Sequence, residues 1–592
     1  MKKIKKEKKT RKIKRVVYLI LLIIPLFSCH REHQKTPETI SNAISPEYLG
    51  EPVSHEGTSL LKDANGKLFF IYRKGDWDHG GFTDTVFYKS SVNEGRSWST
   101  PSPLVITPGK SAQCFATISP VSGEIILFYR KGSKEIMCAR SSNGWKEWDY
   151  QQMFTSDSSS INTICYGNAL WVKNLNSKRV ICGFHGNNQG AGTFYSDDDG
   201  RTWRVSERVN VANQIPNIWQ TGAVEPTFAQ LSNGNILMFL RNSNYHTWQS
   251  ISKDKGASWS KPTETNFYCG DNSWGSLKNL SNGKILYVWN NAKSLPPEVT
   301  MDKWNFTGRE VLHVAISDDD GKTWNGFREL MLDRRRDSLF VNHAGDKGLN
   351  ESKVVETKEG NVLIACGQAE GHRAFMLLDT DWIQMKKNSD NFLEGTKNWS
   401  RQKIMVRPPV YDRWYHYSYD RKPGAVLVPH PDLGNKQVLH VRRPEDTTVF
   451  NQRDGAVWNF PSGRKGVFET RIRLNKGFKG SYIALNDRWF QPIDNQGLVT
   501  AMYVLNIPGS GQLNKKIALE QEKWYTIRLE WDGVENILKD SCTVFIDNQA
   551  LETKLALNNI SSNGISYVRF RSATRWPDNN GMYIESVRAE VE

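Results

Sequence analysis

Short apolar runs, separated by turn residues, recur along residues 51–381. Each run is about the length of one strand, and turn signals return about every 8–12 residues, a spacing typical of all-β domains. No long stretch has the 3.6-residue periodicity of an amphipathic helix. Five of the runs predict equivalent strands that each follow a Gly-containing turn or a turn-rich segment: 68–72, 124–129, 235–240, 284–289 and 361–365.

One turn motif repeats four times and reads Ser-x-x-x-Gly-x-(Ser/Thr)-Trp. The copies begin at Ser91, Ser196, Ser252 and Ser317, and residues 137–148 hold a degenerate copy. The polar side chains can cap backbone groups of a turn, the Gly supplies a positive φ, and the Trp can fold back as an apolar plug. With the degenerate copy, the spacing is about 50 to 65 residues, which is close to the period of a propeller blade.

These turns resemble the Asp-boxes of the sialidase (BNR-repeat) superfamily. The resemblance implies a six-bladed β-propeller, expected over residues 49–385, with the last blade lacking a box. Asp-boxes in that superfamily lie on the blade periphery, so they indicate a fold and not a reaction.

Residues 390–592 contain a second series of predicted strands, including 466–474, 524–531, 543–546 and 568–571. The runs 524–531 and 544–548 resemble a concanavalin/laminin-G-like module. The expected fold class is therefore all-β, a six-bladed propeller followed by a β-sandwich of the jelly-roll kind.

The basic charge of the chain is concentrated at its start. Residues 1–15 hold eight Lys, two Arg and one Glu, which amounts to +9 of the formal +15, so the charge gives no reason to expect a nucleic-acid partner. The apolar run 16–27 is short for a transmembrane span. Residues 26–29 resemble a bacterial lipobox, which implies a lipoprotein signal peptide over 1–28, lipidation of Cys29 and a flexible tether over 29–48. The expected location is the periplasm or the outer-membrane surface, with the membrane reached through the lipid.

Seven further cysteines show neither paired nor regular spacing. We interpret most of them as buried core thiols, with one or two disulfides among them. No pattern supports a metal site, and we expect no cofactor.

Candidate chemistry follows from the sialidase resemblance residue by residue. Glu225 and Arg241 lie in the most specific local match, residues 223–241, and Arg309 matches a second arginine of the superfamily. In the superfamily the Glu polarises the nucleophile and three arginines bind the substrate carboxylate. Guanidinium groups suit this task because they bind a carboxylate with two parallel hydrogen bonds and keep their charge.

The sequence departs from the superfamily at two positions. His55 stands where the first arginine is expected, and Glu351 stands where the nucleophilic Tyr is expected. Glu351 is able to act as a carboxylate nucleophile or base, with Glu225 as its partner. Asp78 and Asp84 both remain candidates for the general acid, beside Arg73.

Three functions fit these residues. The first is an exo-acting glycoside hydrolase that removes a terminal acidic sugar from complex glycans, with Tyr245 and Trp274 as stacking surfaces for sugar rings. The second is a polysaccharide lyase acting on a uronate-containing glycan, for example at a rhamnose-glucuronate linkage, with His55 as the base. The third is a glycan-binding lipoprotein without catalysis.

Overall fold

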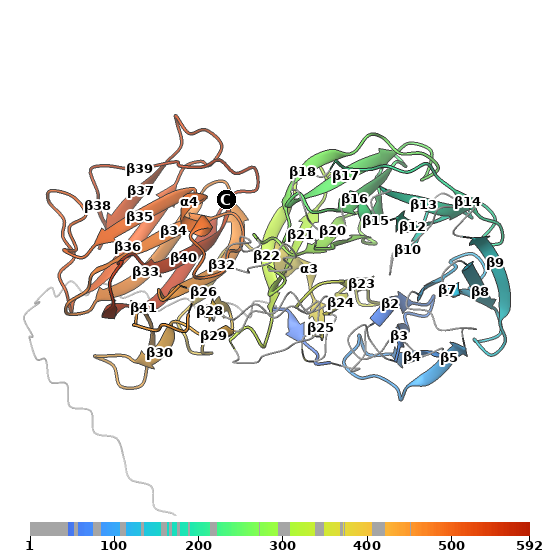
Figure 1. Ribbon diagram of the computed structural model, residues 1–592, viewed down its shortest axis with the longest axis horizontal. Helices are drawn as coiled ribbons and strands as arrows, with labels where there is room; N and C mark the ends of the chain where they lie inside the picture. The colour runs from blue at the N-terminus through green and yellow to red at the C-terminus, as the bar shows by residue number, and fades with distance from the viewer. Residues whose placement is uncertain are drawn as a thin grey trace, which may run out of the picture. The chain divides into compact units, whose positions relative to one another are not determined.

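A computed structural model describes residues 45–592 of the chain (Figure 1). The description leaves out residues 52–56, 75–84, 107–113, 132–134, 156–162, 165–168, 174–177, 187–189, 213–221, 271–272, 294–307, 338–347, 368–370, 372, 405–420 and 450. Cys29, His55, Asp78 and Asp84 therefore lie outside the described residues.

Six antiparallel sheets, here called blades 1 to 6, follow one another along residues 47–378 (Figure 1). Blade 1 holds β2 (Gly57–Lys62), β3 (Leu68–Arg73), β4 (Thr85–Ser91) and β5 (Ser102–Ile106). Blade 2 holds β6 (Cys114–Ile118), β7 (Ile125–Lys131), β8 (Glu135–Ser141) and β9 (Asp149–Thr155). Blade 3 holds β10 (Thr163–Ile164), β11 (Leu170–Trp171), β12 (Val180–Gly186), β13 (Gly190–Ser196) and β14 (Arg204–Val205).

The later blades repeat this order. Blade 4 holds β15 (Val224–Gln230), β16 (Ile236–Arg241), β17 (His246–Ser252) and β18 (Thr263–Tyr268). Blade 5 holds β19 (Ser276–Asn279), β20 (Ile285–Trp289), β21 (Val311–Ser317) and β22 (Asn325–Leu332). Blade 6 holds β23 (Lys353–Glu356), β24 (Val362–Cys366), β25 (Ala374–Leu378) and, from the beginning of the chain, β1 (Glu47–Tyr48).

Blade 6 joins the two ends of the series. β1 pairs with β25, and β2 of blade 1 lies next to β23 of blade 6. One apolar cluster combines side chains of both blades, among them Leu60, Phe70, Phe375 and Leu377. The second strands are buried along their whole length because sheets cover both of their faces, as in β3 and β16. The predicted fold class is confirmed.

Each Asp-box closes a tight turn between the third and fourth strands of its blade. In the box at residues 317–324 the Gly321 N–H donates to Ser317 Oγ (2.8 Å), and the Thr323 N–H donates to Asp319 Oδ1 (2.8 Å). Asp320 has a positive φ of 64°, beside the 78° of Gly321. The expected positive φ of the Gly is present, and the residue before it shares that conformation in all four boxes.

The box tryptophans pack across the junction between neighbouring blades. The ring of Trp203 in blade 3 stands edge-on to Phe128 of β7 in blade 2, with ring centroids 5.1 Å apart. Trp98 of blade 1 contacts Phe375 of blade 6 in the same way, at 5.3 Å. The boxes therefore join one blade to the blade before it, including across the closure of the series.

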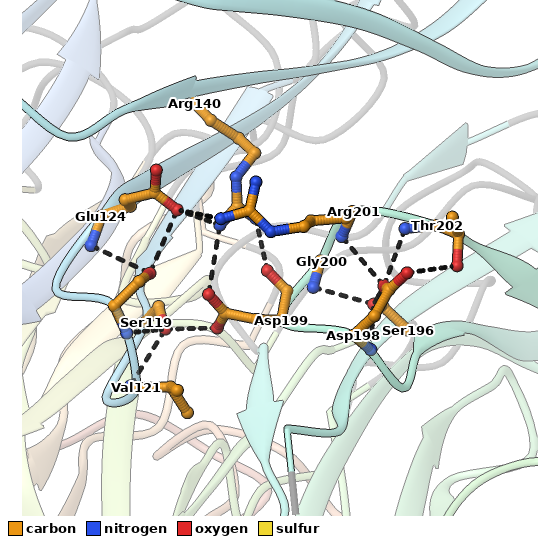
Figure 2. A network of polar contacts seen from close by, with 11 residues as sticks. Ser119, Val121, Glu124, Arg140, Ser196, Asp198, Asp199, Gly200, Arg201 and Thr202 are labelled. Atoms are coloured by element: carbon orange, nitrogen blue, oxygen red, sulfur yellow. Dashed lines mark hydrogen bonds and ion pairs between the residues drawn. The ribbon is translucent and has the colours of Figure 1, made fainter.

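In three of the four boxes the residue before the glycine is acidic, and it makes a second link across the same junction. Figure 2 shows Asp199 accepting hydrogen bonds from Ser119 and from Arg140 Nη2 (3.2 Å), both in blade 2, while Arg140 also pairs with Glu124. Asp320 likewise accepts the Ser232 N–H of blade 4 (2.8 Å). In each case the acid contacts the turn between the first two strands of the preceding blade, or the side chains beside it.

We expect Trp203→Ala to lower the free energy of unfolding of the propeller by about 2–4 kcal/mol, because the substitution leaves a cavity between two blades. Trp576→Ala is the matched control, because that side chain is 74% exposed. Thermal unfolding followed by near-ultraviolet circular dichroism measures both. Equal, small shifts for the two variants would contradict the role assigned to the box tryptophan.

Residues 387–591 form two facing sheets with a common apolar core that includes Trp458, Phe468, Trp531 and Phe570. One sheet holds β26 (Lys387–Asp390), β30 (Val426–Pro429), β31 (Gln437–Arg443), β33 (Gly466–Leu474), β36 (Trp524–Trp531), β37 (Ser541–Ile546), β38 (Gln549–Ala550), β39 (Leu555–Ala556) and β41 (Asp578–Val591). The other holds β27 (Trp399–Ser400), β32 (Gly455–Gly463), β34 (Gly480–Asn486), β35 (Tyr503–Pro508) and β40 (Ile565–Ser572). β28 (Gln402–Ile404) and β29 (Arg421–Pro423) form a separate pair.

The described helices are short: α3 (Thr380–Gln384) and α4 (Gln496–Val499). Among the residues that the structure describes, no helix has the length and hydropathy needed to span a bilayer. β36 alternates between buried and half-buried positions, as a strand with one face on a core does. The precise domain boundaries at residues 385 and 390 stay a prediction.

Six of the cysteines are described, and all six are free and buried: Cys114, Cys138, Cys182, Cys269, Cys366 and Cys542. Burial raises the pKa of Cys138 and of Cys366 to about 12, so these thiols stay protonated. The interpretation as core thiols is confirmed for these six, and the expected disulfides are not found among them.

A buried polar chain joins blade 5 to β40 of the sandwich. The Asn291 N–H donates to His313 Nδ1 (3.0 Å), so His313 Nε2 carries the proton and donates to the Tyr567 hydroxyl (2.5 Å). Tyr567 in turn donates to Glu329 Oε2 (2.9 Å). Burial raises the pKa of Glu329 to about 8, although the hydrogen bond from Tyr567 opposes the shift.

This raised pKa predicts a pH-dependent stability. Between the ordinary pKa of 4.5 and about 8, the unfolded chain loses a proton from Glu329 that the folded protein keeps, so stability falls as the pH rises through this window. We expect Glu329→Gln to flatten this decline and to raise the melting temperature near pH 8. Melting curves against pH for the wild type, for Glu329→Gln and for the exposed control Glu535→Gln measure it. Parallel profiles for all three proteins would show that Glu329 does not titrate in this window.

Candidate functional site

Blade topology places the predicted site residues on one edge of the propeller. In an antiparallel sheet the beginnings of the first and third strands and the end of the second strand lie at the same edge. Glu225 begins β15, Arg241 ends β16 and Arg73 ends β3, while Arg309 and Glu351 stand just before β21 and β23. The Asp-box turns lie at the opposite edge.

Glu225 and Arg241 form an ion pair in the interior of blade 4. Arg241 Nη1 donates to Glu225 Oε2, and the backbone partner of Arg241 across the sheet is Val224. The register shifts between Val224 and Thr227, and Glu225 has a positive φ of 44°. This irregularity turns the Glu225 side chain out of the ordinary strand alternation and toward the guanidinium group.

The electrostatics favour the ionised form of Glu225. Burial alone would raise its pKa, but the charge of Arg241 and its hydrogen bond, a contribution from His185 and the charge of Arg309 together hold the pKa below its ordinary value. Two guanidinium groups from two blades thus act on one carboxylate. The structure brings together Glu225, Arg241 and Arg309.

His185 belongs to the same group. The Glu225 N–H donates to His185 Nδ1 (3.3 Å), and the imidazole is 1% exposed. Burial lowers the pKa of His185 to about 4; Glu225 opposes this shift, and Arg241 adds to it. His185 is therefore a neutral imidazole at ordinary pH.

Glu351 lies on the same edge, just before β23 of blade 6. The Arg309 carbonyl accepts the Leu349 N–H (2.6 Å), which ties Arg309 to the segment that carries Glu351. Lys353 Nζ donates to the Glu351 carbonyl (2.7 Å) and stands 3.5 Å from Glu351 Oε2. Glu351 is 8% exposed and has a positive φ of 54°.

The two predicted aromatic residues have different surroundings. Trp274 is buried. Its backbone N–H donates to Asn350 Oδ1 (3.2 Å), and Lys353 Nζ lies 5.1 Å from its ring centroid, so it packs beside Glu351. Tyr245 lies in the turn after β16, on the same edge, with Lys293 Nζ over its ring. Trp274 is 3% exposed, and its role as a sugar-stacking surface stays a prediction.

Strand register reveals residues that the sequence interpretation missed. In each blade, the last residue of the first strand pairs with a residue of the second strand, and positions are counted from that partner. The sixth position is then Arg73, Arg130, His185 and Arg241 in blades 1 to 4. The sequences Tyr-Arg-Lys-Gly at 72–75 and 129–132 carry this signal for two of them. Lys353 had a signal too, since it stands two residues after Glu351 at the start of a strand.

Arg73 is fully buried at the end of β3, on the shared edge. His55, Asp78 and Asp84 fall in the undescribed part of blade 1, so their roles stay predictions. Within the described ranges, no three His, Cys, Asp or Glu side chains gather in a group that could hold a metal ion.

The fold and this edge define a sialidase-like β-propeller. Residues 116–364 match the family described as BNR repeat-like domain, so this part of the propeller is similar to the sialidase-like BNR-repeat superfamily.

Several solved structures resemble the chain at low identity. An intramolecular trans-sialidase from Ruminococcus gnavus is 13% identical over 57% of this chain and 98% of its own, with a TM-score of 0.42. A sialidase from Trypanosoma rangeli is 10% identical over 92% of this chain and 96% of its own, with a TM-score of 0.37. The NanB sialidase from Streptococcus pneumoniae is 13% identical over 56% of this chain and 70% of its own, with a TM-score of 0.42.

We expect Arg241→Met to lower the free energy of unfolding by about 3–5 kcal/mol, because Glu225 is left as a buried charge without its partner. The double variant Arg241→Met/Glu225→Gln should regain most of that loss. Arg464→Met is the surface control: Arg464 and Glu535 are 57% and 54% exposed, and a change of about 0–1 kcal/mol is expected. Denaturant unfolding measures the three variants, and a double variant less stable than Arg241→Met would contradict the assigned pairing.

Proposed function

We propose that the protein is an exo-acting glycoside hydrolase of the sialidase superfold that removes a terminal acidic sugar from complex glycans. The observation that carries the proposal is the convergence of Arg241 and Arg309 on the ionised Glu225, at the edge of the propeller where the first strands begin. Guanidinium groups held in this way suit a substrate carboxylate, which they bind through paired, charge-assisted hydrogen bonds. A uronic acid carries such a group.

The chemistry then rests on two carboxylates. Glu351 acts as the nucleophile or as the base that activates water, and Glu225 is its partner. Lys353, 3.5 Å from Glu351 Oε2, orients that carboxylate and supplies compensating charge. Asp78 or Asp84 donates the proton to the leaving group. A carboxylate in place of an aryl nucleophile favours a sugar without a carboxylate at the anomeric carbon.

We further propose that the mature protein is a lipoprotein anchored through Cys29 at the periplasmic or outer surface of a bacterial membrane. The basic segment 1–15, the apolar run 16–27 and the lipobox-like residues 26–29 support this location. Membrane fractionation before and after Cys29→Ser tests it, with the variant expected in the soluble fraction.

Incubation of the protein with a panel of uronate-containing glycans, read by product mass, tests the activity. A hydrolase adds one water to the products, whereas a lyase forms a double bond that absorbs in the near ultraviolet. We expect Glu351→Gln and Glu225→Gln each to reduce turnover by about 100-fold or more, while Glu535→Gln stays at the wild-type rate.

Each other outcome identifies an alternative. Near-ultraviolet absorbance that depends on His55 would replace the hydrolase with a lyase. Retained glycan affinity with no product from any substrate would replace it with a binding protein. Unchanged turnover in both carboxamide variants, with melting temperatures near that of the wild type, would remove Glu225 and Glu351 from the mechanism.

A further inference from the structure

A cavity of about 350 Å³ lies between the inner strands of the propeller blades. Every blade contributes to its wall: residues 60–62, 116–118, 169–173, 228–230, 277–281 and 354–356. The polar wall residues Lys62, Gln230 and Glu356 stand at the ends of the first strands, whereas Glu225 and Glu351 stand at their beginnings. Five residues of strand correspond to about 16 Å, so this axial cavity is distinct from the candidate catalytic edge.

The charge around the axial cavity is unbalanced. Lys62, Lys173 and Lys278 line it, from blades 1, 3 and 5, and Glu356 is the one carboxylate in its wall. Both Glu356 oxygens already accept hydrogen bonds from Ser281, at 2.8 Å from its N–H and 2.6 Å from its hydroxyl. The carboxylate is therefore oriented toward the wall by the turn that follows β19.

Several polar groups of the wall have hydrogen-bond partners. Lys62 Nζ donates to the Thr357 carbonyl (3.1 Å), and the Asn279 side chain both accepts from the Gln230 N–H and donates to the Gln230 carbonyl, each at 2.7 Å. Within the described part of the chain, Lys278 Nζ has neither a hydrogen bond nor an ion pair. Burial lowers its pKa, the charge of Lys62 lowers it further, Glu356 opposes the shift, and Lys173 adds to it.

Lys278 is half-buried, and its ammonium group lines the cavity without the ion pair that normally compensates a desolvated charge. The ammonium groups come from separate blades and surround one space, and each offers several donors. A compact ion with several acceptor oxygens and two negative charges would satisfy more than one of them at once, which a halide with a single charge does less well.

We propose that the axial cavity binds one small inorganic oxyanion of the phosphate or sulfate class, held by Lys278 and Lys62 with Lys173 at the rim. The ion balances the charge of the inner strands and links blades 1, 3 and 5 across the axis. It is bound structurally, at the end of the propeller axis remote from Arg241 and Arg309, and takes no part in the chemistry at that edge.

The test uses the mature full chain in phosphate, sulfate or chloride at equal ionic strength. We expect phosphate and sulfate to raise the melting temperature of the wild type along a saturable curve, and chloride to leave it unchanged. Isothermal titration with inorganic phosphate should give one site per chain. A response to ionic strength alone, the same for chloride as for phosphate, would overturn the proposal.

Lys278→Met should weaken phosphate binding by about tenfold or more, because it removes a charge-assisted donor. In chloride the same variant should melt above the wild type, since it removes a desolvated cation that has no partner. Lys261→Met, at an exposed position, should match the wild type in all three salts. If Lys278→Met folds poorly, the phosphate affinity of Lys62→Met provides a second measurement. Undiminished phosphate binding in either lysine variant would overturn the proposal.

Discussion

The contact between each box tryptophan and the preceding blade is the interaction on which the rest of the propeller depends. Each blade needs a neighbouring blade on both sides, because its second strand is apolar on both faces. Trp203 against Phe128 and Trp98 against Phe375 fill the junctions at the outer ends of the strands. Where the residue beside the box glycine is acidic, it adds a directional hydrogen bond to the same junction. This bond fixes the register in which the two blades pack.

That register determines what converges at the other edge. With the blades held in phase, the end of β12 reaches the beginning of β15, and His185 meets the backbone of Glu225. The same phase places Arg309 near enough to influence the Glu225 carboxylate. Charged groups gathered in this way must be compensated in the interior, which explains why the arginines and carboxylates of this edge occur together.

Much of the fold could be predicted from the sequence, because its signals are local. The boxes, the strand runs and the turns that separate them depend on residues a few positions apart. The cross-blade contact of Asp199 with Ser119 and Arg140 could not be predicted, since nothing in the box distinguishes a solvated acid from one that reaches another blade. Docking of the sandwich through His313 and Tyr567 joins residues 254 positions apart and has no local signal.

The candidate site likewise contains residues that could be predicted from the sequence and residues that could not. Glu225, Arg241 and Arg309 were predicted from superfamily resemblance, and their convergence follows from blade geometry. His185 and Lys353 belong to no motif. The signal for His185 is its strand position, equivalent to that of Arg241 in blade 4, and the signal for Lys353 is its place two residues after Glu351. The burial of Trp274 could not be predicted, because an aromatic residue near a predicted sugar site carries no signal of its own burial.

The pairing of β1 with β25 has a consequence for how the molecule forms. The strand from the start of the propeller cannot find its partner until residues 374–378 have been made, so five blades can assemble while the ring is still open. Once made, β25 presents an unpaired edge until β1 reaches it, and a second chain could pair with it in place of β1. The final closure joins residues more than 320 positions apart, and the order of synthesis makes it the last step of propeller assembly.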